Sequence, residues 1–437
     1  MAKTYRPWDV DQVWLLPASI QDFVPPGHPA HFVRDTVREA LDLSAVRQPY
    51  EAEERGFPPY HPAMMTALLL YAYTQGIYSS RRIAKACEER VDVMAVTGMS
   101  RPDFRTISDF RKRHLTALSG LFVQVLRLCR EAGLVKLGHV AIDGTKIKAN
   151  ASKHKAMSYG RMKQAEPKLA AEVAAWLARA AAADAAEDRE HGAARRGDEM
   201  PDWAANKQKR LAKIRAAKAA LEAAARGDDE GEGGAAGPGN DAAAAPRVPD
   251  DKAQRNFTDP ESRILPTKDG FVQGYNAQAA VDAEHQIIVA TGIANSGSDQ
   301  DQLAPMIDAV IANTGRVPRQ TSADAGYCSE ANLEAAEARG TRAYIATGRQ
   351  RHGAAAPGNP RRHRSGSKVA AMATRLKRGG YRSRYRLRKI TVEPVFGQIK
   401  APRGFRQFLL RGLGKVKHEW NLVCLTHNLK KLAAAAG

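Results

Sequence analysis

The fold of this chain is decided by a short stretch, residues 138–144, which has the sequence GHVAIDG. A short apolar run bounded by turn residues is typical of a buried strand, and the Asp-Gly pair indicates where that strand ends. Residues 145–151 continue the pattern, with Ile147 and Ala149 alternating with polar residues. We therefore expect the first strand of a sheet here, with Asp143 at its carboxyl end.

Residues 156–255 differ in composition from the sequence on either side. They contain 32 alanines, interspersed with Lys, Arg and Glu. Alanine has the highest helix propensity, so residues 169–186 and 203–225 are predicted to be two helices. Residues 228–249 are rich in Gly, Ala, Pro and Asp, which is typical of a disordered linker. We interpret 156–255 as a helical insert between two strands.

Strand and helix patterns alternate after the insert. Strands are predicted over 270–282, 286–293, 321–323 and 341–346, and helices over 303–311 and 329–339. The resulting order is strand, insert, strand, strand, helix, strand, helix, strand, helix. This order predicts a mixed α/β domain over 136–437, built around one central sheet, and it is the order of an RNase H-like fold.

The part before residue 135 is predicted to be helical. A helix is expected over 31–41, and residues 60–132 show helical spacing of apolar residues. Within that region a short helix follows Ser79, and a basic helix runs from Arg105 to about Ala132. Short helices with exposed arginines suit a DNA-binding domain of the helix-turn-helix kind over 1–135. Taken alone, these residues slightly favour a plain helical bundle with solvated arginines.

The charge of the chain indicates an acidic partner. The 437 residues include 67 Lys and Arg against 47 Asp and Glu, a net charge of +20. Residues 348–417 alone hold 20 of these basic residues and one acid, Glu393. A solvated basic tail is one explanation, but apolar residues at regular spacing predict that this region folds. Nucleic acid is therefore the expected partner.

Several classes of protein are excluded by composition. The four cysteines lie far apart, which argues against a disulfide scaffold or a zinc finger. The longest apolar stretch, residues 64–73, is too short to span a bilayer. Residues 1–30 contain acids and prolines, unlike a signal peptide. We expect a cytoplasmic protein that has no membrane partner.

Three carboxylates stand where chemistry on DNA would need them. Asp143 and Asp324 each end a predicted strand, and ligands bind at strand ends in open α/β sheets. Glu393 is expected at a helix start, because Pro394 suits the first helical turn. Singly, the three could be a turn residue, a helix cap and a partner for an arginine. Together they predict a site for two Mg²⁺ ions, which accept oxygen ligands and act on phosphodiesters in pairs about 3.5–4 Å apart.

Two lysines flank the third acid. Lys400 follows Glu393 by seven residues, about two helical turns, and so shares its face. Lys389 precedes Glu393 by four residues and would share this face if the helix began earlier. Both could hold a phosphate, although most lysines are simply exposed.

Six blocks of the sequence resemble the DDE transposases of bacterial insertion sequences, and most closely the branch named for insertion sequence eleven-eighty-two. They occur in the order found in that family and cover most of the chain outside the insert. The blocks are HPAMMTALLLYAYTQGIYSSRR (61–82), RTISDFRKRH (105–114), AIDGTKIKANAS (141–152), GFVQGYNAQAAVD (270–282), SADAGYCSEANL (322–333) and VEPVFGQIK (392–400).

The resemblance implies an RNase H-like catalytic domain preceded by a helical transposase domain. It assigns the metal-binding acids of that family to Asp143, Asp324 and Glu393, with two Mg²⁺ or Mn²⁺ ions per active site. Such an enzyme cleaves DNA at the ends of the element to free a 3′-hydroxyl, which then attacks target DNA. In this hypothesis Lys389, Lys400 and Arg403 position phosphates.

Related elements carry a Tyr-Arg-Glu-Lys signature around the last acid. Its Glu and Lys match Glu393 and Lys400. Lys389 occupies the usual Arg position and Arg386 the usual Tyr position, while Tyr385 and Arg388 stand one residue earlier.

The partners implied by this hypothesis are terminal inverted repeats, recognised by the amino-terminal helices, and target DNA. Two DNA ends must be brought together, so a homodimer is expected. The main alternative is a non-catalytic DNA-binding protein, either a regulator or a domesticated relic of an element. A general nuclease or resolvase on the same fold is a third interpretation.

Overall fold

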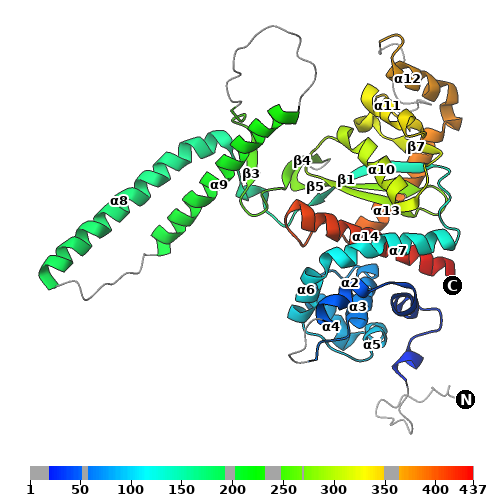
Figure 1. Ribbon diagram of the computed structural model, residues 1–437, viewed down its shortest axis with the longest axis horizontal. Coiled ribbons are helices and arrows are strands. Elements are labelled where there is room, and N and C mark those ends of the chain that lie inside the picture. The colour runs from blue at the N-terminus through cyan, green and yellow to red at the C-terminus, as the bar shows by residue number, and fades with distance from the viewer. Residues whose placement is uncertain are drawn as a thin grey trace, which may run out of the picture.

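The computed structural model describes residues 19–51, 58–191, 202–231, 248–267, 270–348 and 364–436. A group of helices from the amino-terminal part lies on one side of the molecule, a central sheet with its own helices lies on the other, and a long helical hairpin extends away from both (Figure 1). Within these described ranges, none of the helices combines the length and apolar character needed to span a bilayer.

The central sheet has β1 in its interior. On one side β1 pairs antiparallel with β5, and β5 also pairs antiparallel with β4 and β6. On the other side β1 pairs parallel with β7, which pairs parallel with β8. The strands are β1 (Val140–Lys148), β4 (Arg263–Thr267), β5 (Gly270–Asp282), β6 (Ile288–Ala294), β7 (Gln320–Ala323) and β8 (Arg342–Ile345). Four strands in antiparallel pairs, β1, β4, β5 and β6, and two strands that run parallel to β1, β7 and β8, confirm the predicted mixed α/β, RNase H-like fold. β4 was not predicted.

The first strand is longer than its sequence pattern indicated. β1 does not end at Asp143 but pairs with β5 without interruption from Val140↔Asp282 to Lys148↔Gly274. The far end of this pairing requires a glycine, because a Cβ at Gly274 would lie 2.3 Å from the Ile147 carbonyl oxygen. The Asp-Gly pair is therefore inside the strand, and the expectation of a strand end there was wrong.

Helices cover both faces of this sheet. They follow the predicted order and are α10 (Leu303–Thr314), α11 (Glu330–Ala338), α12 (Lys368–Gly379), α13 (Leu387–Lys400) and α14 (Leu413–Ala436). α14 packs against β6 on one side and against α7 (Leu115–Glu131) and α3 (Pro62–Thr74) on the other. Figure 1 shows α7 and α14 side by side between the sheet and the amino-terminal helices. One hydrophobic core runs through both parts, so a domain boundary at residue 135 stays a prediction.

The amino-terminal part is helical, as predicted. Its helices are α1 (Pro29–Asp35), α2 (Ser44–Glu51), α3, α4 (Ser80–Glu89), α5 (Val91–Thr97), α6 (Phe104–Arg113) and α7. The single helix expected over 105–132 is two helices, which meet at His114. The helix expected over 31–41 is α1 followed by a π-helical turn, Thr36–Ala40.

The alanine-rich segment forms the predicted helical hairpin between two strands. Its helices are α8 (Tyr159–His191) and α9 (Asp202–Gly231), and the short strands β2 (Ala156–Ser158) and β3 (Gln254–Asn256) pair at its base. Next to this base the two helices share a small core of their own that includes Met162 and Ile214. Most of the predicted linker, residues 232–247, lies outside the described residues.

Arg403 has a structural position and does not present a phosphate-binding group to solvent. It is 4% exposed, and its guanidinium donates to the carbonyl oxygens of Tyr73 on α3 and Val423 on α14 and to the Thr426 hydroxyl. The expectation that Arg403 contacts DNA therefore does not agree with its surroundings. This arginine joins the amino-terminal helices to α14.

Arg403→Gln should lower the free energy of unfolding by about 2–4 kcal/mol, because the shorter amide leaves buried carbonyl groups without donors. Arg406→Gln, at a neighbouring exposed arginine, should change it by less than about 0.5 kcal/mol. Urea denaturation measures both. Equal stability of the two variants would contradict a structural role for Arg403.

Candidate active site

The pairing of two parallel strands brings the first two acids together. In the register of β1 and β7, Val140 lies opposite Thr321 and Ala141 opposite Ser322. Two residues further along the chain in each case are Asp143 and Asp324, which the register therefore sets side by side. β7 ends at Ala323, so its pairing with β1 stops before Asp143, although β1 itself continues.

The third acid comes from α13. This helix begins at Leu387, six residues before Glu393, so the expectation of a helix start at Glu393 was wrong. Pro394 lies inside the helix and lacks the N–H that would bond the Ile390 carbonyl oxygen. The side-chain amide of Gln286 replaces that donor, with an Nε2–O distance of 3.0 Å. A proline in mid-helix is therefore tolerated next to Glu393.

Arg388 connects the first acid to the third. It lies on the first turn of α13, and its side chain is only 10% exposed. One guanidinium nitrogen, Nη1, donates to Oδ2 of Asp143, and the other, Nη2, lies 3.1 Å from Oε1 of Glu393. The Arg388 guanidinium stands 6.0 Å from the centre of the Tyr385 ring. Tyr385 and Arg388, which stand one residue before the usual Tyr and Arg positions of the signature, are thus the residues that lie at the site.

The buried position of Asp143 controls the electrostatics. Burial raises the pKa of its carboxyl to about 7; Arg388 opposes this shift, and the charges of Asp324 and Asp299 add to it. Oδ1 of Asp143 accepts the N–H of Gly144, at 2.9 Å. A carboxyl group that titrates near neutrality in an acidic cluster is typical of a functional site.

The simpler roles considered for Asp324 and Glu393, a helix cap and a partner for an arginine, are found in part as well. Oδ1 of Asp324 accepts the Gly326 N–H at 2.8 Å and so caps a 3-10 turn, Ala325–Tyr327. Glu393 pairs with an arginine, as noted above. Among the residues that the structure describes, no three His, Cys, Asp or Glu side chains are close enough together to hold one metal ion.

The two predicted lysines differ in position. Lys400 is half-buried against β1, where its Nζ donates to the Thr145 hydroxyl and, at 3.0 Å, to the carbonyl oxygen of Lys146. Burial lowers the pKa of Lys400, and the nearby Arg406 and Lys146 lower it further. Lys389 lies exposed on the first turn of α13.

Asp299 is a fourth acid at the site that the sequence analysis did not select. It lies in the loop between β6 and α10, and its Oδ1 accepts hydrogen bonds from Asn276 Nδ2 at 2.5 Å and Gln278 Nε2 at 2.7 Å. Both amides come from β5, opposite Lys146 and Gly144 of β1. The sequence contained one signal for such a partner. GYNAQ places the amide side chains of Asn276 and Gln278 on one face of a strand, and buried amides need hydrogen-bond partners.

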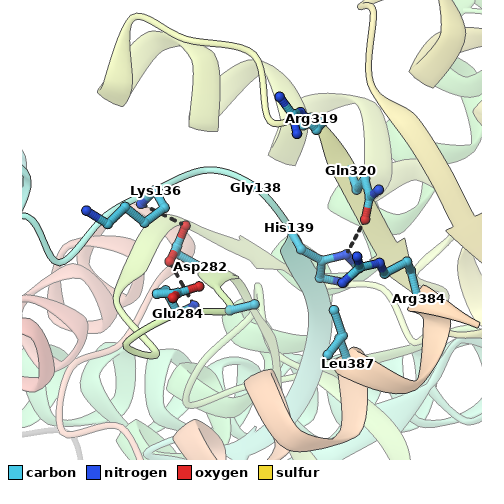
Figure 2. Close-up of a pocket in the computed structure, with 10 residues that line it drawn as sticks. Lys136, Gly138, His139, Asp282, Glu284, Arg319, Gln320, Arg384 and Leu387 are labelled. Carbon is cyan, nitrogen blue, oxygen red and sulfur yellow. Dashed lines mark hydrogen bonds between the residues drawn. The ribbon is translucent and has the colours of Figure 1, made fainter. Parts of the chain in front are cut away.

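A separate cavity of about 320 Å³ lies at the other end of β1. Figure 2 shows His139 facing Gln320, with Arg384 alongside and Asp282 hydrogen-bonded to the backbone near Lys136. Burial lowers the pKa of His139 to about 4, so its ring is neutral at pH 7. This cavity contains none of the four acids of the site.

Two family models match the chain. They are a transposase domain, DUF772, over residues 18–113 and a transposase DDE domain over residues 350–433. The first covers α1–α6, and the second contains Glu393 and Lys400. No curated protein and no solved structure matches the chain significantly.

The RNase H-like sheet and the DDE match together indicate a transposase of the DDE class. With the amino-terminal transposase domain, these matches support a DDE transposase of an insertion sequence.

Gly144→Ala should destabilise the protein by about 1–3 kcal/mol, because its Cβ would lie 2.4 Å from Gln278 Nε2 and 2.6 Å from Asp299 Oδ1. Gly138→Ala is the matched control on the same segment, since nothing lies within 4 Å of its Cβ. Thermal or urea unfolding compares them. A Gly144→Ala protein as stable as the control would show that these side chains do not pack over Gly144.

The stability of the cation-free protein should fall as pH rises from about 4 to 7. The unfolded chain releases the Asp143 proton near pH 3.8, while the folded protein keeps it to about pH 7, so the folded state binds more protons in this window. Between pH 4 and 7 the free energy of unfolding of the wild type should fall by on the order of 2–4 kcal/mol relative to that of Asp143→Asn. Parallel stability curves for the two proteins, measured by urea unfolding in EDTA, would contradict a raised pKa.

Proposed function

We propose that this transposase cleaves DNA at the ends of its insertion sequence and transfers the freed 3′-hydroxyl ends to target DNA. The single observation that carries the proposal is that Asp143 is connected to both of the other acids, Asp324 and Glu393, although the three carboxylates are not close enough together here to hold one ion. Asp143 and Asp324 meet through strand register, and Glu393 is joined to Asp143 through Arg388.

The chemistry of this edge fits divalent cations. The three acids offer carboxylate oxygens, which Mg²⁺ prefers, and burial together with the charges of Asp324 and Asp299 raises the pKa of Asp143, so a cation beside it would be stabilising. Asp143, Asp324 and Glu393 would hold two Mg²⁺ or Mn²⁺ ions, with Arg388 withdrawn from between Asp143 and Glu393. Such a pair of cations activates water and stabilises the leaving oxygen of a phosphodiester.

The residues around the acids orient the DNA. Asp143 is fixed on an interior strand and Glu393 on a helix packed against that strand, so the distance between them is set by secondary structure. Lys400, half-buried beside Thr145, offers a localised positive charge for a phosphate next to the scissile one. Lys389, exposed on the same helix, is suited to a phosphate further out.

The remaining parts of the proposal concern DNA ends and assembly. Arg81 and Arg105 stack on the exposed ring of Phe104 in the amino-terminal helices, at 5.0 and 5.7 Å. This basic, aromatic surface suits recognition of terminal inverted repeats, with 1–135 as the DNA-reading domain, 136–437 as the catalytic domain and 156–255 as its insert. Two copies acting on paired ends, a cytoplasmic location and membership of the eleven-eighty-two branch complete the proposal.

The test is cleavage of a labelled element end, taken from the DNA that flanks the coding sequence, in the presence of Mg²⁺. Asp143→Asn, Asp324→Asn and Glu393→Gln should each lose at least about a hundredfold in rate, because each removes several kcal/mol of transition-state stabilisation. Asp301→Asn, at an exposed acid beside α10, is the matched control and should cleave like the wild type. Cleavage that survives in the Asp143→Asn protein would refute the assignment.

A further inference from the structure

A lysine outside the predicted set stands next to the acidic site. Lys146 lies on β1 three residues after Asp143, roughly 10 Å along an extended strand. Its side chain is 20% exposed, and its Nζ lies 3.8 Å from Oδ2 of Asp299 and 3.4 Å from the carbonyl oxygen of Gly297. The ammonium group is therefore held in one place and still reaches solvent.

Asp299, which pairs with Lys146, lies close to Asp324. A Cβ at Gly326 would lie 3.1 Å from Oδ1 of Asp324 and 3.4 Å from Oδ2 of Asp299. The two carboxylates thus flank one glycine, and Oδ2 of Asp299 is also the carboxylate oxygen that pairs with Lys146. The positive charge of Lys146 is consequently held on the Asp324 side of the site.

Asp299 has hydrogen-bond partners other than Lys146. Its other oxygen, Oδ1, already accepts two hydrogen bonds, from Asn276 and Gln278. Its side chain makes no cap for the turn that follows, Gln300–Gln302. The Lys146 ammonium group carries three N–H donors, so it can contact a phosphate while it stays beside Asp299.

Lys146 and Lys400 lie on opposite sides of the same strand. Lys400 reaches β1 at Thr145, which shares the face of Asp143, whereas Lys146 points to the face of Gly144, Asn276 and Gln278. Beyond Asp143 the strand therefore carries one ammonium group on each face. A DNA strand whose scissile phosphate lies at the acids would meet both charges.

We propose that Lys146 contacts a backbone phosphate beside the scissile one and that Asp299 is the positioning residue that holds it there. The proposal rests on the proposed function. The alternative is an ordinary surface ion pair, which is worth about 0–1 kcal/mol and would affect nothing else.

The first experiment measures DNA binding by the full chain as a function of salt, without requiring cleavage. The probe is a fluorescent duplex carrying the element end, titrated between 50 and 200 mM NaCl. Lys146→Gln should reduce the magnitude of the slope of log K against log salt by about 1, because one phosphate contact is lost. Lys146→Arg should restore the slope. Lys207→Gln, which breaks a comparable ion pair with Glu172 on the distant hairpin, is the matched control and should bind like the wild type.

The second experiment separates the role of Asp299 from a merely structural one. Asp299→Asn keeps the size of the side chain and an oxygen for the two amides, so Lys146 and its phosphate contact remain and the salt slope should be unchanged. The cleavage rate at saturating DNA should fall about tenfold, since the ammonium group is no longer held in place. Adding Asp299→Asn to Lys146→Gln should cause no further loss, because Asp299 acts through Lys146.

An unchanged salt slope in Lys146→Gln would overturn the proposal, as would fully additive losses in the double variant. These outcomes differ from failure of the proposed function, in which the wild type itself binds the element end without cutting it. In that case the salt slopes still decide whether Lys146 contacts a phosphate.

Discussion

A carboxyl group kept away from water is the constraint on which the rest of this site depends. Asp143 lies on an interior strand with two more aspartates nearby, so its negative charge is costly unless a cation lies beside it. Arg388 supplies that cation and extends the connection to Glu393. The same demand for positive charge that fixes Arg388 makes this edge of the sheet suitable for divalent ions and for the lysines that surround it.

The surrounding architecture fixes the positions of the strand and the helix that carry Asp143 and Glu393. β1 is paired along its whole length with β5, and α13 is fixed to β1 through Arg388 and Lys400. α14 and the buried Arg403 tie those amino-terminal helices to the catalytic sheet, so DNA held by one part would be placed relative to the other.

Local irregularities occur where the site needs them. Pro394 interrupts the hydrogen bonds of α13 directly after Glu393, and Gln286 compensates for the missing donor. Gly144 leaves room for the amides and the carboxylate packed behind Asp143. Each of these residues breaks a local rule for helices or strands, and each lies beside an acid of the site, which is where such exceptions are expected.

The sequence by itself determined most of the order of the elements, apart from β4 and the division of α6 from α7, together with the helical hairpin, the RNase H-like class and the three candidate acids, because apolar periodicity and an acid next to a short apolar run are local signals. It could not determine that β1 continues past Asp143, since strand length depends on cross-strand pairing with β5. Nor could it distinguish Arg403 from Arg388: both lie in the same basic region, and only packing buries one under α14 and turns the other toward Asp143. Asp299 and Lys146 are paired only by the tertiary structure, because 153 residues separate them and no local pattern links a loop acid to a strand lysine.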